Sequence, residues 1–151
     1  MKRSAGLLLY RRKPDLEVLL VHPGGPFFAR HDVWGIPKGE YLAAEEPLAA
    51  AYREFAEETG FPPPKGDPVP LGEVVQRGGK RVVAWALEGD LDVDKLVSNT
   101  FQMPWRGRFQ SFPEIDEGRW FTPEEAVAKM SEAQRQFVER LLAVLEDVTS
   151  G

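Results

Sequence analysis

The sequence predicts one α/β or α+β domain spanning residues 1–151. Short apolar runs of strand length recur along the chain, and amphipathic stretches with helical spacing lie among them. A chain of 151 residues is the size of one ordinary domain and can bury a substantial core. The composition, with 42% hydrophobic and 28% charged residues, is close to that of typical globular proteins.

Four apolar runs have the length and boundaries of strands: Ala5–Tyr10, Leu16–His22, Leu71–Gln76 and Arg81–Leu87. Residues 11–15 are polar and contain a proline, so they predict a hairpin loop between the first two runs. Gly78-Gly79 is a strong hairpin signal between the last two. A further short strand is expected over residues 114–121. His22, at the end of its run, either packs there or faces a substrate, and we favour packing.

The stretch Gly39–Phe61 predicts a helix preceded by a turn-rich loop. Pro47 suits a first helical turn, and Gly60 is the expected C-terminal stop. Leu48 and Phe55 recur at helical spacing. We therefore expect one face of this helix to pack against the core and the other to gather carboxylates.

Glu54, Glu57 and Glu58 stand at i, i+3 and i+4, so a helix brings their side chains onto one face. Like charges at these spacings destabilise a helix, and a divalent cation would offset that cost. Mg²⁺ accepts carboxylate oxygens and binds substrate phosphates in its remaining positions. Taken alone, three glutamates are more often a solvated face.

The spacing of the whole stretch favours a metal-binding face over a solvated one. Its fixed positions are Gly39, Glu45, Arg53, Glu54, Phe55, Glu57, Glu58, Gly60 and Phe61. This pattern resembles the signature of the Nudix hydrolases at every one of those positions. The resemblance implies a mixed sheet between helices, with the signature forming a loop, a helix and a loop. It also implies hydrolysis of a nucleoside diphosphate linked to another moiety.

The resemblance implies a role for each matching residue. Glu54, Glu57 and Glu58 would hold Mg²⁺ or Mn²⁺, with help from the carbonyl of Gly39. Arg53 would orient the glutamates while paired with Glu45.

The general base stays open between Glu54 and an acid outside the signature. Glu114 is the first candidate for that acid and Glu117 the second, although both also suit a solvated surface. Lys38, beside the signature, could stabilise charge on a leaving phosphate.

Residues Asp90–Pro113 predict a long irregular segment, a type of loop that is usually functional or mobile. Trp105 and Phe109 suit stacking on a base, and Arg106 and Arg108 suit pairing with phosphate. The alternative is a flap packed over the core with its arginines in solvent. Phe27, Phe28 and Trp34 fit either a wall of a base pocket or a cover of the core.

The C-terminal part predicts two helices that carry no chemistry. Thr122-Pro123-Glu124-Glu125 has the composition of a capping box, and Ser131-Glu132-Ala133-Gln134 repeats it. Apolar residues then recur at helical spacing at Phe137, Leu141, Leu145 and Val148.

The substrate is less defined than the chemistry. Pro37-Lys38-Gly39 resembles the diadenosine tetraphosphate hydrolase branch, but the tyrosine expected beyond the signature is missing. We therefore expect a nucleoside polyphosphate, with dinucleoside polyphosphates favoured. The alternatives are an NTP or ADP-ribose pyrophosphohydrolase, a nucleotide-sensing module without turnover, and an RNA 5′-end pyrophosphohydrolase.

Composition also limits the partners. A net charge of −5 argues against a long nucleic acid, so we expect a small-molecule nucleotide. The sequence has no cysteine, which fits a cytoplasmic protein, and no run long enough to span a membrane. The resemblance allows a homodimer.

Overall fold

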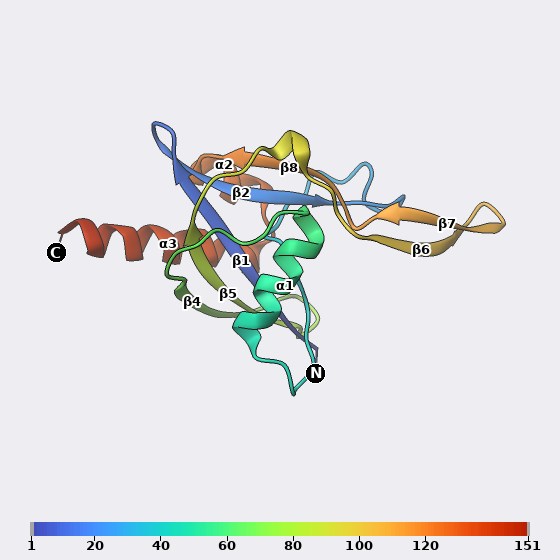
Figure 1. Ribbon diagram of the computed structural model, residues 1–151, viewed down its shortest axis with the longest axis horizontal. Helices are drawn as coiled ribbons and strands as arrows, with labels where there is room; N and C mark the ends of the chain where they lie inside the picture. Colours follow the sequence, from blue (N-terminus) through green and yellow to red (C-terminus); the bar gives the residue numbers. More distant parts are fainter. Residues whose placement is uncertain (1, 151) are drawn as a thin grey trace.

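The computed structural model describes residues 2–150, and their side chains as far as residue 146. Its centre is a mixed six-stranded sheet in the order β4-β5-β1-β2-β8, with β3 also paired to β1 (Figure 1). The strands are β1 (Arg3–Arg12), β2 (Leu16–Pro23), β3 (Lys38–Glu40), β4 (Val69–Val75), β5 (Arg81–Glu88) and β8 (Ile115–Phe121). β1 and β5 are parallel, and the other pairs are antiparallel.

Helices cover both faces of this sheet. Because side chains alternate along a strand, β1 sends Ala5, Leu7 and Leu9 to one core cluster and Leu8 to the other. The first cluster lies under α1 (Pro47–Thr59), and the second lies under α2 (Pro123–Lys129) and α3 (Glu132–Ser150). The predicted mixed sheet between helices is confirmed.

The helix of the signature forms as predicted, but its faces differ from the prediction. Pro47 lies in its first turn, and Gly60 ends it in the left-handed conformation, with a φ of 78°. Phe55 is fully buried, whereas Leu48 is only half-buried. Glu54 and Glu58 are also buried, so two of the carboxylates point into the protein rather than onto a solvated face.

The two C-terminal helices are present. The capping box of α2 is complete, with Thr122 and Glu125 bonded in both directions. Only half of the second predicted capping box forms. The backbone N–H of Gln134 donates to the Ser131 hydroxyl, but the Gln134 side chain accepts from the backbone of Ile36 instead of Ser131. Phe137 and Leu141 are buried as expected, and the side chain of Val148 lies outside the described residues.

The prediction of an irregular segment over residues 90–113 is wrong. After a short 3₁₀ turn at Val93–Lys95, strands β6 (Thr100–Trp105) and β7 (Arg108–Pro113) form a hairpin that extends away from the body (Figure 1). Arg106 and Gly107 form its two-residue turn, with φ angles of 53° and 84°. Positive φ at both positions is the type I′ geometry that matches the twist of paired strands.

Candidate active site

Strand β3 brings the backbone of Gly39 against the helix that carries the glutamates. Gly39 pairs with Ala5 of β1, and its backbone faces the side chain of Glu54. A Cβ atom at residue 39 would lie 2.0 Å from the carboxyl carbon of Glu54. Only glycine therefore permits this approach, which explains the glycine at the first position of the signature.

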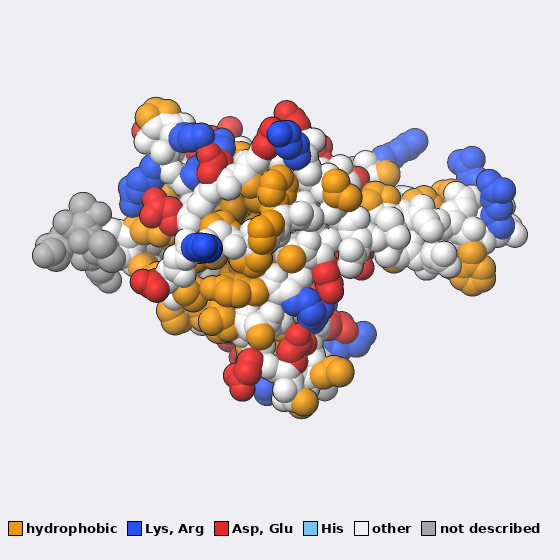
Figure 2. All heavy atoms as spheres, in the orientation of Figure 1, with side chains coloured by type: hydrophobic (Ala, Val, Ile, Leu, Met, Phe, Trp, Pro, Cys, Tyr) orange, Lys and Arg blue, Asp and Glu red, His pale blue; other side chains and the backbone are white. Residues whose placement is uncertain are grey.

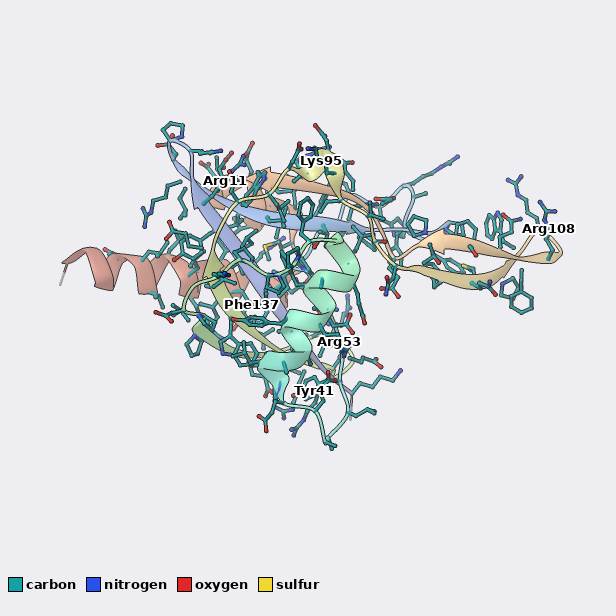
Figure 3. The ribbon with its side chains drawn as sticks, viewed as in Figure 1. Arg11, Tyr41, Arg53, Lys95, Arg108 and Phe137 are labelled. Atoms are coloured by element: carbon teal, nitrogen blue, oxygen red, sulfur yellow. The ribbon has the colours of Figure 1, made fainter. Side chains whose placement is uncertain are left out.

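Arg53, labelled in Figure 3, bonds to three of the carboxylates of the signature. Its guanidinium pairs with both oxygens of Glu45, at 2.9 and 3.1 Å. Its Nη1 donates to Glu54 at 2.8 Å and to Glu57 at 3.2 Å. The bond to Glu45 is the largest cause that raises the pKa of Arg53, so the guanidinium stays charged. Arg53 thus fixes the orientation of three carboxylates.

Glu58 is the most deeply placed of the glutamates. Its Oε2 accepts the backbone N–H of Lys38 at 2.8 Å. Burial raises the pKa of Glu58 to about 8, and the negative charges of Glu54 and Glu114 act in the same direction. Burial likewise raises the pKa of Glu54. This concentration of buried negative charge favours a bound cation.

Glu114 joins this group from a distant part of the sequence. The N–H of Asn99 donates to the carbonyl of Glu57, and the N–H of Glu114 donates to the carbonyl of Asn99, each at 2.8 Å. These bonds hold Glu114 beside the end of α1. Burial raises its pKa, and the charges of Glu54 and Glu57 raise it further.

The second candidate acid, Glu117, lies elsewhere. It is half exposed and pairs with Arg119 at 2.7 Å on strand β8. Of the two candidates, the structure brings only Glu114 to the signature glutamates.

The donors suit a hard divalent cation. Glu54, Glu57 and Glu58 supply carboxylate oxygens, and Gly39 adds a backbone carbonyl. Within residues 2–146, however, no three acidic or histidine side chains converge at ligand spacing. The guanidinium of Arg53 bonds to both Glu54 and Glu57, and its single positive charge offsets part of their negative charge. A metal would have to share these two carboxylates with Arg53.

A cleft of about 430 Å³ opens next to Glu58 and Lys38. Apolar and aromatic side chains form most of its wall, including Trp34 and the half-exposed Phe28. Phe27 is 67% exposed and does not line the cleft. A mostly apolar cleft beside the signature glutamates is suited to a nucleobase.

Two glutamines add side-chain amides to the lining of the cleft, beside Lys38, Glu58 and Ser131, and the sequence analysis did not predict either as a site residue. The Oε1 of Gln134 accepts the backbone N–H of Ile36 at 3.0 Å, and its Nε2 donates to Gln76 at 3.2 Å. Both therefore present amides in fixed orientations. A glutamine that replaces glutamate in a capping-box position was the only signal available for Gln134.

The four residues predicted to hold a base and phosphates lie at the far end of the β6–β7 hairpin. Trp105 and Arg108 are cross-strand partners beside the turn, and Phe109 is 71% exposed. Figure 3 shows Arg108 at the tip, well separated from Arg53. Within one chain, the structure does not bring Trp105, Arg106, Arg108 and Phe109 to the carboxylates.

His22 packs, as favoured. The ring is buried beside Trp34, with 5.2 Å between the ring centroids. Its Nδ1 lies 2.8 Å from Asp116, and its Nε2 lies 2.5 Å from the carbonyl of His31.

The NUDIX domain family model matches residues 1–141, which is nearly all of the chain. The chain belongs to the Nudix family. The family generally uses a divalent metal, and the match supports the predicted pyrophosphohydrolase. No curated protein matches the chain.

Solved structures share the fold. A C. elegans Ap4A hydrolase, solved as a binary complex, has a TM-score of 0.70 at 22% identity, and the match covers 95% of this chain and 98% of that one. The NUDIX domain of Shewanella oneidensis NrtR, complexed with ADP ribose, has a TM-score of 0.64 at 19% identity, covering 95% and 87%. The MutT protein from Methanosarcina mazei has a TM-score of 0.61 at 24% identity, covering 92% and 91%.

None of the helices within residues 2–150 combines the length and apolar character that a membrane span needs.

Proposed function

We propose that this Nudix protein hydrolyses a pyrophosphate bond in a nucleoside polyphosphate with Mg²⁺ or Mn²⁺, and that dinucleoside polyphosphates such as diadenosine tetraphosphate are favoured. The observation that carries the proposal is the complete set of signature glutamates, with Glu54 against the Gly39 backbone and Glu58 on the wall of a cleft of about 430 Å³. Pro37-Lys38-Gly39 and the shared fold of an Ap4A hydrolase support the favoured substrate.

In this mechanism, Glu54, Glu57 and Glu58 hold the metal together with the Gly39 carbonyl. A metal held there would supply charge neutralisation for the phosphates and would lower the pKa of a water molecule. Arg53 keeps the glutamates oriented through its bonds to Glu54 and Glu57.

Two further residues act on the proton and the leaving group. Glu114 faces the same carboxylates and has no ion-pair partner within residues 2–146, so it is our first candidate to accept the proton of the attacking water. Glu54 is the second. Lys38, on the wall of the cleft beside Glu58, stabilises charge on the leaving phosphate.

The cleft next to Glu58 takes one base. Phe28 and Trp34 supply the aromatic surface, while Gln76 and Gln134 supply amide groups that can bond to the edge of the base. In this proposal the cleft holds one nucleoside, and the second nucleoside of a dinucleotide lies outside it.

The test is a panel of diadenosine tetraphosphate, ADP-ribose, NTPs and their 8-oxo forms, each with Mg²⁺ and with Mn²⁺, with the products resolved by chromatography. We expect ATP and AMP from diadenosine tetraphosphate ahead of the other substrates. NTP cleavage to NMP and pyrophosphate would instead identify an NTP pyrophosphohydrolase.

Glu57→Gln and Glu58→Gln test the metal site within the same assay. We expect turnover to fall by orders of magnitude while the circular dichroism spectrum is unchanged. Near-normal activity of both purified variants would refute the proposed metal site.

A nucleotide-sensing module is the second candidate, because the NUDIX domain of NrtR, which shares the fold, is complexed with ADP ribose. Binding of ADP-ribose by calorimetry, without turnover of any substrate in the panel, would favour it. Multiple turnover would exclude it.

A further inference from the structure

The hairpin β6–β7, residues 100–113, is an arm that stands apart from the rest of the chain. Its two strands pair only with each other, and six residues per strand give it a length of about 20 Å. Every hydrogen bond or ring contact of residues 102–111 that the structure records lies within the arm. An isolated two-stranded hairpin is only marginally stable in water, so packing against another surface would stabilise the arm.

The arm carries the chemistry of a binding surface. Phe101, Met103 and Trp105 are half-buried and alternate along one strand with more exposed residues, and Phe112 faces Phe101 with 6.0 Å between ring centroids. The tip has hydrophobic and basic side chains together (Figure 2). The arm has two arginines and no acidic residue, while the chain has a net charge of −5. An acidic surface therefore complements it.

The cations next to the signature glutamates are largely used within the protein, whereas the arm carries two arginines at its tip. The guanidinium of Arg53 is bonded to Glu45, Glu54 and Glu57. Lys38 is half-buried beside Glu58, and its pKa is lowered, first by burial and then by Lys80. Lys80 in turn pairs with Glu40. Arg53 and Lys80 are thus already paired with protein carboxylates, which leaves Lys38 to meet the leaving phosphate, whereas a polyphosphate substrate brings several negative charges of its own.

The arm cannot supply its arginines to the site of its own chain. It is flanked by Asn99 and Glu114, the two residues whose backbone bonds attach it beside the end of α1. From there it leads outward, so that Arg108 lies far from Arg53 (Figure 3). Only another molecule can receive the tip.

We propose that the arm docks onto a second copy of this chain, so that Arg106 and Arg108 bind the polyphosphate held at the partner's glutamates. A two-fold axis makes the exchange mutual, so each site receives one arm. Trp105 and Phe109 then stack on the part of the substrate that the cleft does not hold. This assignment rests on the proposed function and extends it.

Solution mass is the first test, because it does not depend on turnover. Light scattering is applied to the wild-type protein and to a variant in which residues 102–111 are replaced by a two-residue turn. We expect a dimer for the wild type and a monomer for the shortened variant. A wild-type monomer at assay concentrations, or a dimer that survives loss of the arm, would overturn the proposal.

The second test uses the paired substitution Arg106→Ala/Arg108→Ala on the fastest substrate of the panel. We expect KM to rise about tenfold or more, the scale of losing charge-assisted contacts to phosphate, with a smaller change in kcat. Arg12→Ala/Lys65→Ala removes the same charge from exposed positions elsewhere and is the matched control. Equal KM for the two paired variants would count against a substrate-binding role of the arm.

Mixing separates a partner's arm from the chain's own. Equal amounts of Glu58→Gln and Arg106→Ala/Arg108→Ala chains, allowed to exchange, form heterodimers that contain one complete site. We expect about a quarter of wild-type activity by random pairing. No gain over the separate variants would refute action between chains. If no substrate is cut at all, the proposed function fails, and the solution mass still decides whether the arm binds a second copy.

Discussion

At the scale of single residues, the backbone of Gly39 determines where the carboxylate of Glu54 can lie. An added Cβ would meet both carboxylate oxygens of Glu54, at 2.1 and 2.4 Å. We therefore expect Gly39→Ala to displace that carboxylate and lower kcat by about 100-fold, the cost of a small misplacement at a reacting centre.

Steady-state kinetics would measure this loss. The control is Gly78→Ala, where a Cβ would meet nothing within 4 Å and the strain of a positive φ falls on a distant turn. Full activity in Gly39→Ala would show that the contact with Glu54 has no role in turnover.

Glu114 and Glu117 are a matched pair for locating the general base. Both are glutamates three residues apart, but only Glu114 faces Glu54 and Glu57, while Glu117 pairs with Arg119. We expect Glu114→Gln to lower kcat by about 10²–10⁴-fold, the usual contribution of a general base, and Glu117→Gln to leave it unchanged. Metal binding measured by calorimetry should persist in Glu114→Gln, which separates proton transfer from metal coordination. If kcat is unaffected, the base is Glu54.

At the scale of elements, the sequence predicted the strands and helix that are determined by interactions between residues close together in the chain. The apolar runs of β1 and β2 and the proline and glycine at the two ends of α1 act within a few residues, so the sequence alone predicted these elements. The burial of Glu54 and Glu58 depends on β3, which packs against α1 from another part of the chain. The spacing of residues along a helix carries no information about a contact with a separate strand, so this burial could not be predicted.

The arm was missed for a different reason. Pro104 lies within β6, and a proline inside a run argues against a strand, although an isolated hairpin leaves an edge where it is tolerated. Arg106-Gly107 is a weaker turn signal than Asn-Gly, because only its second residue favours a positive φ. The attachment of Glu114 beside α1 also depends on this hairpin, so its position could not be predicted.

Gly107 is the residue on which the turn of the arm depends. Its φ of 84° is costly for a β-branched side chain, so we expect Gly107→Val to destabilise the arm by about 1–2 kcal/mol. Hydrogen exchange of amides in β6 and β7 should accelerate, while the melting temperature of the body stays the same. Gln102→Val, at an exposed strand position of the same arm, is the control and should not accelerate exchange. Unchanged exchange in Gly107→Val would mean that the turn does not hold the arm.

At the scale of the whole molecule, His22 joins three segments. The ring lies on β2, one nitrogen faces Asp116 of β8, and the other faces the carbonyl of His31 in the loop before β3. Both partners are acceptors, so both nitrogens can donate only when the ring is protonated and positively charged. Glu117 and Asp32 add negative charge nearby, and Arg119, over the ring of Trp34, adds positive charge.

These contacts make the stability of the fold depend on pH. Burial lowers the pKa of His22, but the bonds to His31 and Asp116 outweigh it, so the pKa lies above its ordinary value of 6.5. A raised folded-state pKa gives a contribution that is complete below the unfolded value and is lost as the pH rises through the folded value. We expect the wild type to exceed His22→Gln by about 1–2 kcal/mol of unfolding free energy near pH 6, and by less near pH 9.

Urea unfolding at both pH values would measure this difference. The chain has one other histidine, the exposed His31, so His31→Gln is the matched control, and it keeps the backbone carbonyl that His22 contacts. Its difference from the wild type should be small and constant with pH. A difference for His22→Gln that does not change with pH would show that the ring is neutral in the folded protein. One of its two nitrogens would then face an acceptor without a proton, and the link between β2, β8 and the loop would rest on one hydrogen bond and on packing against Trp34.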